Sequence, residues 1–286
     1  MTPFIRSLVL LLATGDESRI VMHEIRGGVL IEDLVFKTRL NDYVTAYRVC
    51  PVRAKAVPGI LFVHWLDTTE PDSNRSQFLS EAVTLGQAGA CGLLVNTMWS
   101  QADWFASRDA AKDRRSTERQ RDRIADALTF LLSSPKVDKS RVAYVGHDFG
   151  GMFGALLASS ENRGQFWAFQ AATPRWHEWY LLGRGGLDAM ARQAAIDSTA
   201  DLDPIKAVTQ ARGSFFFQFA TKDTFVPRER AQEFFDAAPE PKKIVWYDSG
   251  HEMNAAAARD RVAWLRERLS IGSGRAIPKP VKRQTQ

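Results

Sequence analysis

Cysteine is scarce in this sequence, because the 286 residues contain only Cys50 and Cys91. Neither belongs to a CxxC pair or a ligand cluster, which argues against zinc-finger and thiol-redox motifs. A disulfide between them is open, but we expect two buried thiols in a reducing compartment. The chain also lacks a run of about 18 apolar residues, so no membrane-spanning helix is predicted.

Excess charge is confined to one end of the chain. The formal net charge is +5, and residues 275–286 supply four of these positive charges through Arg275, Lys279, Lys282 and Arg283. The rest of the chain is close to neutral, so the high isoelectric point is weak evidence for nucleic-acid binding. We expect residues 271–286 to form a disordered basic tail, and we expect neither a nucleic-acid nor a membrane partner.

The first residues, MTPFIRSLVLLLATGDE, contain one basic residue and a short apolar run. A secretory signal usually has a longer apolar region and a more basic start. We therefore interpret residues 1–27 as an extension, beginning with a helix, that packs on the core. This favours a cytoplasmic protein over a secreted or periplasmic one.

Apolar runs of strand length alternate with helical patterns from residue 28 to residue 270. This alternation predicts an α/β fold with a mostly parallel sheet of eight strands and helices on both faces. Two segments near residues 28–38 and 43–50 predict an antiparallel opening pair. Residues 173–207 are too long for a simple connection, so we expect them to form a small lid.

One short motif, VGHDFGG, has the spacing of a strand–turn–helix elbow that presents a nucleophile. Gly146 and Gly150 stand two residues before and two after Asp148. Glycines at these positions let the strand and the helix approach closely around a strained central residue. Asp148 could alternatively be a structural residue that caps the helix after the turn.

Two further turns supply partners for Asp148. Asp223 follows a predicted strand in the turn Lys-Asp-Thr, and His251 follows the last strand in the turn Ser-Gly-His. Each residue could simply cap a turn or a helix. Together they give the chain order nucleophile, acid and histidine, which is that of the α/β-hydrolases.

From about Val29 to Leu269 the sequence resembles the α/β-hydrolase superfamily, and within it the dienelactone hydrolase-like group. The resemblance rests on the FVHW segment with His64, the Arg-Ser-x-Phe-Leu segment at 75–79, and the Lys-Asp-x-x-Val-Pro turn at 222–227. That group carries Ser or Cys at the elbow. The aspartate here is instead similar to the elbow of epoxide hydrolases and haloalkane dehalogenases.

The resemblance implies a hydrolase of a small organic substrate that needs no cofactor or metal. An aspartate suits attack on a saturated carbon, so we expect an alkyl ester on Asp148 that His251, oriented by Asp223, then hydrolyses with water. One alternative is a dienelactone hydrolase-like carboxylic ester hydrolase. Another is a catalytically silent hydrolase fold used for binding. The sequence does not indicate an oligomeric state.

The resemblance also implies an oxyanion hole formed by the backbone N–H of Phe149 and that of Trp65 or Leu66. The expected pocket and lid residues could hold a leaving group or could pack on the core, and His64 could be a core histidine with its hydrogen bonds satisfied. They are His64, Trp176, His177, Trp179 and Tyr180.

Overall fold

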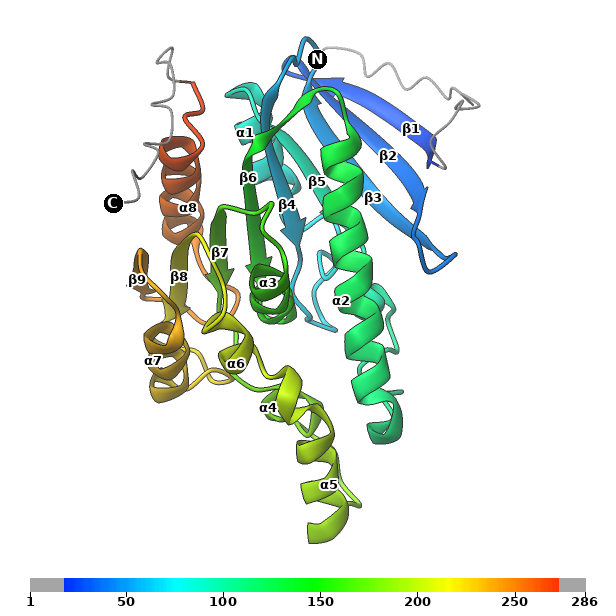
Figure 1. Ribbon diagram of the computed structural model, residues 1–286, viewed down its shortest axis with the longest axis vertical. Coiled ribbons are helices and arrows are strands. Elements are labelled where there is room, and N and C mark those ends of the chain that lie inside the picture. Colours follow the sequence, from blue (N-terminus) through cyan, green and yellow to red (C-terminus); the bar gives the residue numbers. More distant parts are fainter. Residues whose placement is uncertain (1–17, 273–286) are drawn as a thin grey trace, which may run out of the picture.

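The computed structural model describes residues 18–272 of the chain, and within this range nine strands form one sheet (Figure 1). Their order across the sheet is β1-β2-β3-β5-β4-β6-β7-β8-β9. The strands are β1 (Ser18–Arg26), β2 (Val29–Lys37), β3 (Tyr43–Pro51), β4 (Val57–Val63), β5 (Cys91–Val95), β6 (Val137–His147), β7 (Phe166–Gln170), β8 (Ser214–Ala220) and β9 (Lys242–Tyr247).

The sheet is mixed, with an antiparallel part followed by a parallel part. Strands β1, β2 and β3 pair antiparallel, and β3 pairs antiparallel with β5. Every later pair, from β5–β4 to β8–β9, is parallel. The predicted α/β-hydrolase architecture is confirmed, with nine strands in place of eight.

Helices cover both faces of the sheet because successive residues of the central strands point to opposite sides. Ile60 and Phe62 of β4 pack in the core beneath α1 and α8, whereas Leu61 and Val63 pack in the core beneath α2 and α3. The helices are α1 (Leu79–Gln87), α2 (Ala110–Ser133), α3 (Phe149–Ser160), α4 (Trp176–Tyr180), α5 (Ala189–Thr199), α6 (Pro204–Val208), α7 (Arg228–Ala237) and α8 (Ala255–Arg268). Short 3-10 turns occupy Met98–Ser100 and Ala200–Leu202.

The ninth strand, β1, lies within the segment 1–27 that the sequence suggested as an extension of the core. Residues Ser18–Arg26 pair with β2 along its length, so the sheet begins about ten residues earlier than expected. The helix expected at 1–17 and the tail from residue 273 onward lie outside the described residues.

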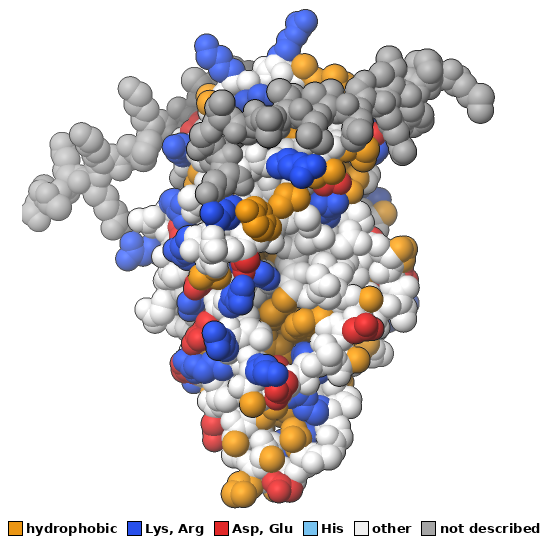
Figure 2. Space-filling model, turned by 90° about the vertical axis from the view of Figure 1, so that its right-hand side faces the viewer, with side chains coloured by type: hydrophobic (Ala, Val, Ile, Leu, Met, Phe, Trp, Pro, Cys, Tyr) orange, Lys and Arg blue, Asp and Glu red, His pale blue; other side chains and the backbone are white. Residues whose placement is uncertain are grey.

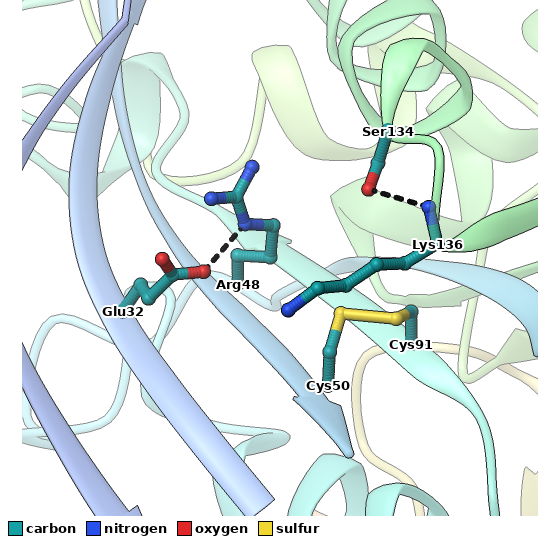
Figure 3. Close-up of a disulfide and its surroundings, with 6 residues drawn as sticks. All are labelled: Glu32, Arg48, Cys50, Cys91, Ser134 and Lys136. Atoms are coloured by element: carbon teal, nitrogen blue, oxygen red, sulfur yellow. Dashed lines mark hydrogen bonds and ion pairs between the residues drawn. A yellow bond between two sulfur atoms is a disulfide. The ribbon is translucent and has the colours of Figure 1, made fainter. Parts of the chain in front are cut away.

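The two cysteines form a disulfide that joins neighbouring antiparallel strands (Figure 3). Cys50 belongs to β3 and Cys91 begins β5, and their Cα atoms lie 4.3 Å apart. The expectation of two free thiols was therefore wrong. The sequence offered no signal for the bond, because the two cysteines lie 41 positions apart in the chain and meet only when their strands pair.

Basic and acidic side chains are interspersed on the face of the molecule that carries α2 (Figure 2). Arg119 and Arg123 of α2 both pair with Asp42 in the β2–β3 turn, and Arg114 pairs with Asp201. Burial favours a higher pKa for Asp42, but hydrogen bonds from Arg123, Thr38 and Arg119 outweigh it and lower this pKa to about 2. The charged run at 108–123 is thus a face of ion pairs rather than a free basic patch.

The segment between β7 and β8 contains α4, α5 and α6 and extends from the carboxyl end of the sheet (Figure 1). It includes residues 173–207, where the sequence suggested a lid. Within residues 18–272, no helix combines the length and apolar character needed to span a bilayer.

Candidate active site

Asp148 lies at the tip of the turn between β6 and α3, in a conformation that non-glycine residues rarely adopt. Its φ is 53° and its ψ is −117°. A Cβ at Gly146 would lie 2.3 Å from the backbone of Gly150, and a Cβ at Gly150 would lie 2.1 Å from the carbonyl oxygen of Val63. Both glycines are therefore required for the elbow, and the strain at Asp148 is enforced by its surroundings.

The two carboxylate oxygens of Asp148 have different environments. Oδ2 accepts a hydrogen bond from the backbone N–H of Leu66 at 3.1 Å, whereas Oδ1 has no hydrogen-bond partner among residues 18–272. The side chain is fully buried. Burial raises the pKa of Asp148 to about 7, although the nearby His251 and the N–H groups of Leu66 and Phe149 oppose this shift.

His251 and Asp223 form a hydrogen-bonded pair in the loops after β9 and β8. The distance from His251 Nδ1 to Asp223 Oδ2 is 2.8 Å. The other oxygen of Asp223 accepts hydrogen bonds from the backbone N–H groups of Phe225, at 2.8 Å, and Val226, at 3.0 Å. The turn thus fixes the carboxylate, and the carboxylate fixes the orientation of the imidazole ring.

The second ring nitrogen of His251 is available for chemistry. Nε2 is buried and has no partner within the described part of the chain. Burial opposes protonation of this ring, but the hydrogen bond to Asp223 and the negative charges of Asp148 and Asp223 raise the pKa of His251 above its usual value. A histidine in this state can give a proton and take one back near neutral pH.

A cavity of about 560 Å³ adjoins this group of residues. Its wall includes His251 and also Leu66, whose N–H is bonded to Asp148, whereas Asp148 itself is fully buried. The apolar and aromatic part of the wall comes from Trp65, Leu66, Phe105, Trp179, Leu182 and Phe225. This wall favours a small, largely apolar organic molecule.

Trp179 is the expected lid residue that reaches this cavity. Its ring packs edge-on against His251, with centroids 5.6 Å apart, and stacks on Phe225 at 5.4 Å. Its buried indole N–H has no acceptor among residues 18–272. Asp148 Oδ1, His251 Nε2 and Trp179 Nε1 are thus three buried polar atoms without protein partners in one part of the molecule.

The other expected pocket residues do not line the cavity. His64 is a core histidine, because Nδ1 donates to the carbonyl oxygen of Trp65 and Nε2 accepts from Thr97 and Ser100. Burial lowers its pKa to about 3.

The remaining lid residues pack on the core or lie outside the wall. The indole N–H of Trp176 donates to Leu202, and the hydroxyl of Tyr180 is hydrogen-bonded to Thr117. His177 is half-buried beside three arginines that, together with burial, lower its pKa. Trp176 and Tyr180 thus follow the alternative that the sequence left open, that of lid aromatics packing on the core. His177 lies outside the cavity wall.

The backbone N–H groups of Trp65 and Leu66, the two alternatives for the second oxyanion donor, have different hydrogen-bond partners. The N–H of Trp65 donates to Gln77 Oε1 at 2.9 Å, so Leu66 is the residue whose N–H reaches Asp148. Gln77 and His147 were not identified from the sequence as parts of the site. Their one signal is position, since Gln77 lies within the Arg-Ser-x-Phe-Leu segment and His147 precedes Asp148 directly.

The fold and the three loops at the carboxyl edge of the sheet define an α/β-hydrolase. Among solved structures, the chain is similar to an acetyl xylan esterase from Paenibacillus sp. R4, with 13% identity over 93% of this chain and 90% of that chain and a TM-score of 0.72. It is also similar to acetyl xylan esterase 1 from Thermoanaerobacterium sp. JW/SL YS485, with 13% identity over 89% and 88% of the two chains and a TM-score of 0.67. An esterase domain from Rhodothermus marinus shares 17% identity over 84% of this chain and 99% of that domain, with a TM-score of 0.61. At these identities the likeness shows the fold alone.

The sequence profile of the dienelactone hydrolase family matches residues 99–266, which is more than half of the 286 residues. The chain therefore belongs to this family of hydrolases. No curated protein matches it. Among residues 18–272, no group of three or more His, Cys, Asp or Glu side chains is arranged to hold a metal ion.

Proposed function

We propose that the protein hydrolyses small carboxylic esters by covalent catalysis. In this proposal Asp148 is the nucleophile, His251 is the acid–base group, and Asp223 orients His251. The observation that carries it is the difference in hydrogen bonding between the two carboxylate oxygens of Asp148. Oδ2 is held by the N–H of Leu66, while the buried Oδ1 has no partner among the described residues.

Carboxylic esters are the preferred substrate class because the chain belongs to the dienelactone hydrolase family and its fold is similar to that of several esterases. These comparisons favour the ester alternative over the epoxides and haloalkanes suggested by the aspartate alone. The apolar wall of the cavity suits a short acyl chain or an aromatic alcohol group.

In the first step Asp148 Oδ1 attacks the acyl carbon of the ester, and the bond from that carbon to the alcohol oxygen breaks. The leaving oxygen takes the proton from Nε2 of protonated His251. The products of this step are the free alcohol, neutral His251 and an anhydride between Asp148 and the acyl group.

In the second step neutral His251 takes a proton from water, and the resulting hydroxide attacks Cγ of Asp148. The N–H of Leu66 already points at Oδ2, where negative charge develops. The bond from Cγ to the bridging oxygen breaks, and the carboxylate product leaves. Asp148 ionises again by losing one proton to solvent, so one water is consumed for each ester.

A second candidate is the alkyl-enzyme ester route on an epoxide or haloalkane. It is favoured by the same contact, because Oδ2 occupies the N–H of Leu66 that would otherwise stabilise the carbonyl oxygen of an ester substrate. Attack on a saturated carbon develops no charge there. The free indole N–H of Trp179 could then receive the leaving group. In the second step His251 would again activate water for attack on Cγ of Asp148, but the product that leaves is an alcohol, which takes its proton from His251.

The experiment compares the parent protein with Asp148→Asn and Asp248→Asn on panels of activated esters, epoxides and haloalkanes. Asp248 is an exposed aspartate paired with Lys222 and serves as the matched control. We expect ester turnover by the parent and the control but not by Asp148→Asn. Turnover of epoxides or haloalkanes alone would select the second candidate. No turnover of any panel by the parent would favour a silent fold that binds rather than hydrolyses.

A further inference from the structure

A second, larger cavity lies on the α1 and α8 side of the sheet, with a volume of about 780 Å³. It shares Trp65, Glu70 and Glu252 with the cavity described above. Gln77 and His147 also line it, and neither has a role in the proposed chemistry. His147 is 1% exposed, ends β6 and directly precedes Asp148, so its surroundings bear directly on the elbow.

His147 connects the elbow to the loop that carries His251. His147 Nε2 lies 2.9 Å from the backbone carbonyl oxygen of His251, which can only accept a hydrogen bond. Nε2 therefore carries a proton. Burial, together with the charge of His251, lowers the pKa of His147 well below its usual value, so the ring is neutral and Nδ1 is an acceptor.

Gln77 completes the connection. Its Nε2 lies 2.7 Å from His147 Nδ1, and its Oε1 accepts the backbone N–H of Trp65 at 2.9 Å. The two contacts agree on the orientation of the amide, since the nitrogen must donate to Nδ1 and the oxygen must accept from Trp65. The Trp65 ring stacks on His147 with centroids 4.9 Å apart and planes 15° apart.

We propose that Gln77 and His147 are positioning residues. They hold the Trp65–Leu66 loop, the Asp148 elbow and the His251 loop in fixed positions relative to one another. This inference rests on the proposed function, because the relative position of these three loops affects turnover only if they act together in catalysis. The Trp65 peptide is fixed by Gln77, and the next N–H in the chain, that of Leu66, holds Asp148 Oδ2.

The geometry explains why such a connection is needed. His251 follows the last strand of the sheet, in a turn where Met253 has a φ of 63° and no regular strand or helix holds the backbone. Its carbonyl is held by His147 instead. A displacement of about 1 Å in a reacting group can lower the rate on the order of 10²-fold, so a single buried hydrogen bond at this point affects turnover.

The first test measures kcat and KM for an ester that the parent turns over. We expect His147→Leu and Gln77→Leu to lose roughly 10- to 100-fold in kcat with little change in KM. His147→Gln can still donate to His251 and accept from Gln77, and should keep most of the activity. Thr117→Val is the control, because it removes a buried hydrogen bond between α2 and Tyr180, away from these loops.

The large cavity allows a rescue experiment. His147→Ala leaves a space that opens into the 780 Å³ cavity, so added imidazole can occupy the place of the missing ring. We expect imidazole to restore part of the kcat of His147→Ala and to leave Thr117→Val unchanged. Equal losses in all variants, or losses in KM rather than kcat, would mean that His147 only stabilises the fold.

A measurement without substrate separates this inference from the proposed function. Nitrogen NMR on protein labelled in histidine should show His147 as a neutral ring protonated at Nε2 that does not titrate between about pH 5 and 8. In His147→Leu, the proton signal of His251 Nδ1 bonded to Asp223 should broaden or disappear. A ring protonated at Nδ1, or an unchanged His251 signal, would overturn the positioning role. If the spectra are as expected but the protein hydrolyses no ester, the proposed function is contradicted and the positioning role is not.

Discussion

His251 Nδ1 lies 2.8 Å from Asp223 Oδ2, although the two residues stand on separate turns 28 positions apart in the chain. The turn after β8 supplies two N–H groups to the far oxygen of Asp223, so that the near oxygen faces the imidazole. Because Asp223 occupies Nδ1, Nε2 of His251 is left free beside the elbow and can act as the general base.

Replacing Asp223 with asparagine should lower kcat on the order of 10³-fold and change the melting temperature little. The amide can still accept from Phe225 and Val226, but its N–H2 group faces His251 Nδ1 and favours the wrong tautomer of the ring. Steady-state kinetics on an activated ester measures the effect, with Asp248→Asn as the control. A loss below about 10-fold would argue against an orienting role for Asp223.

The pH dependence of kcat/KM should show a rising limb centred near pH 7. Asp148 attacks only when ionised, and burial raises its pKa to about 7. The water-activating step needs neutral His251, whose pKa is also raised, so kcat, which includes this step, should rise with pH as well. A p-nitrophenyl ester suits the assay, since its leaving group needs no proton. A rate independent of pH from about 5 to 9 would contradict this assignment.

Asp148→Asn should be more stable than the parent above pH 7 while it loses turnover. The folded-state pKa of Asp148 lies above its value of 3.8 in the unfolded chain, so ionisation opposes folding increasingly as the pH rises from about 4 to 7. A shift of this size corresponds to roughly 4 kcal/mol. Urea unfolding at pH 5 and pH 9 should show the difference growing with pH. A variant that is less stable than the parent at pH 9 would contradict the pKa shift.

In the alkyl-enzyme ester route, where the indole N–H would receive the leaving group, Trp179→Phe should lower kcat about 10-fold while it preserves the aromatic packing on His251 and Phe225. The change removes the buried indole N–H that has no acceptor among the described residues. Trp176→Phe is the comparison, because the N–H of Trp176 is already bonded to Leu202. If both variants behave alike, the N–H of Trp179 has no part in turnover.

Removing the disulfide should destabilise the fold by about 4 kcal/mol, as expected for a closed loop of this length. The bond joins residues 41 positions apart, so it restricts the unfolded chain considerably. Unfolding of the Cys50→Ala, Cys91→Ala double variant against the oxidised parent measures this effect, and a thiol assay reports whether the bond forms. A disulfide is typical of oxidising compartments and weighs against the predicted cytoplasmic location. Free thiols in the purified protein would restore that prediction.

The sequence was sufficient to predict the architecture because the signals were local. Apolar runs marked the central strands, and Gly146, Asp148 and Gly150 marked the elbow by spacing alone. The pairing of Asp223 with His251 followed from chain order. Strand β1 was missed because its burial alternates weakly at the edge of the sheet, where five of its nine residues are exposed.

Other features could not be predicted because they depend on side-chain contacts across the fold. The sequence could not say that Trp176 and Tyr180 turn into the core while Trp179 faces the cavity, since all three belong to one short helix. It could not reveal that Gln77 meets His147, because the turn before α1 and the end of β6 come together only in the folded chain. The free oxygen of Asp148 likewise depends on where Leu66 lies.

The central claim is that Asp148 forms a covalent intermediate, and isotope transfer tests it most directly. A single turnover in water enriched in oxygen-18, followed by proteolysis and mass spectrometry, locates the new oxygen. The account predicts a gain of about 2 mass units in the peptide that contains Asp148, because water attacks Cγ of that residue. Label found only in the released acid, with none in Asp148, would show that water attacks the acyl carbon and not Cγ of Asp148, and would contradict the account.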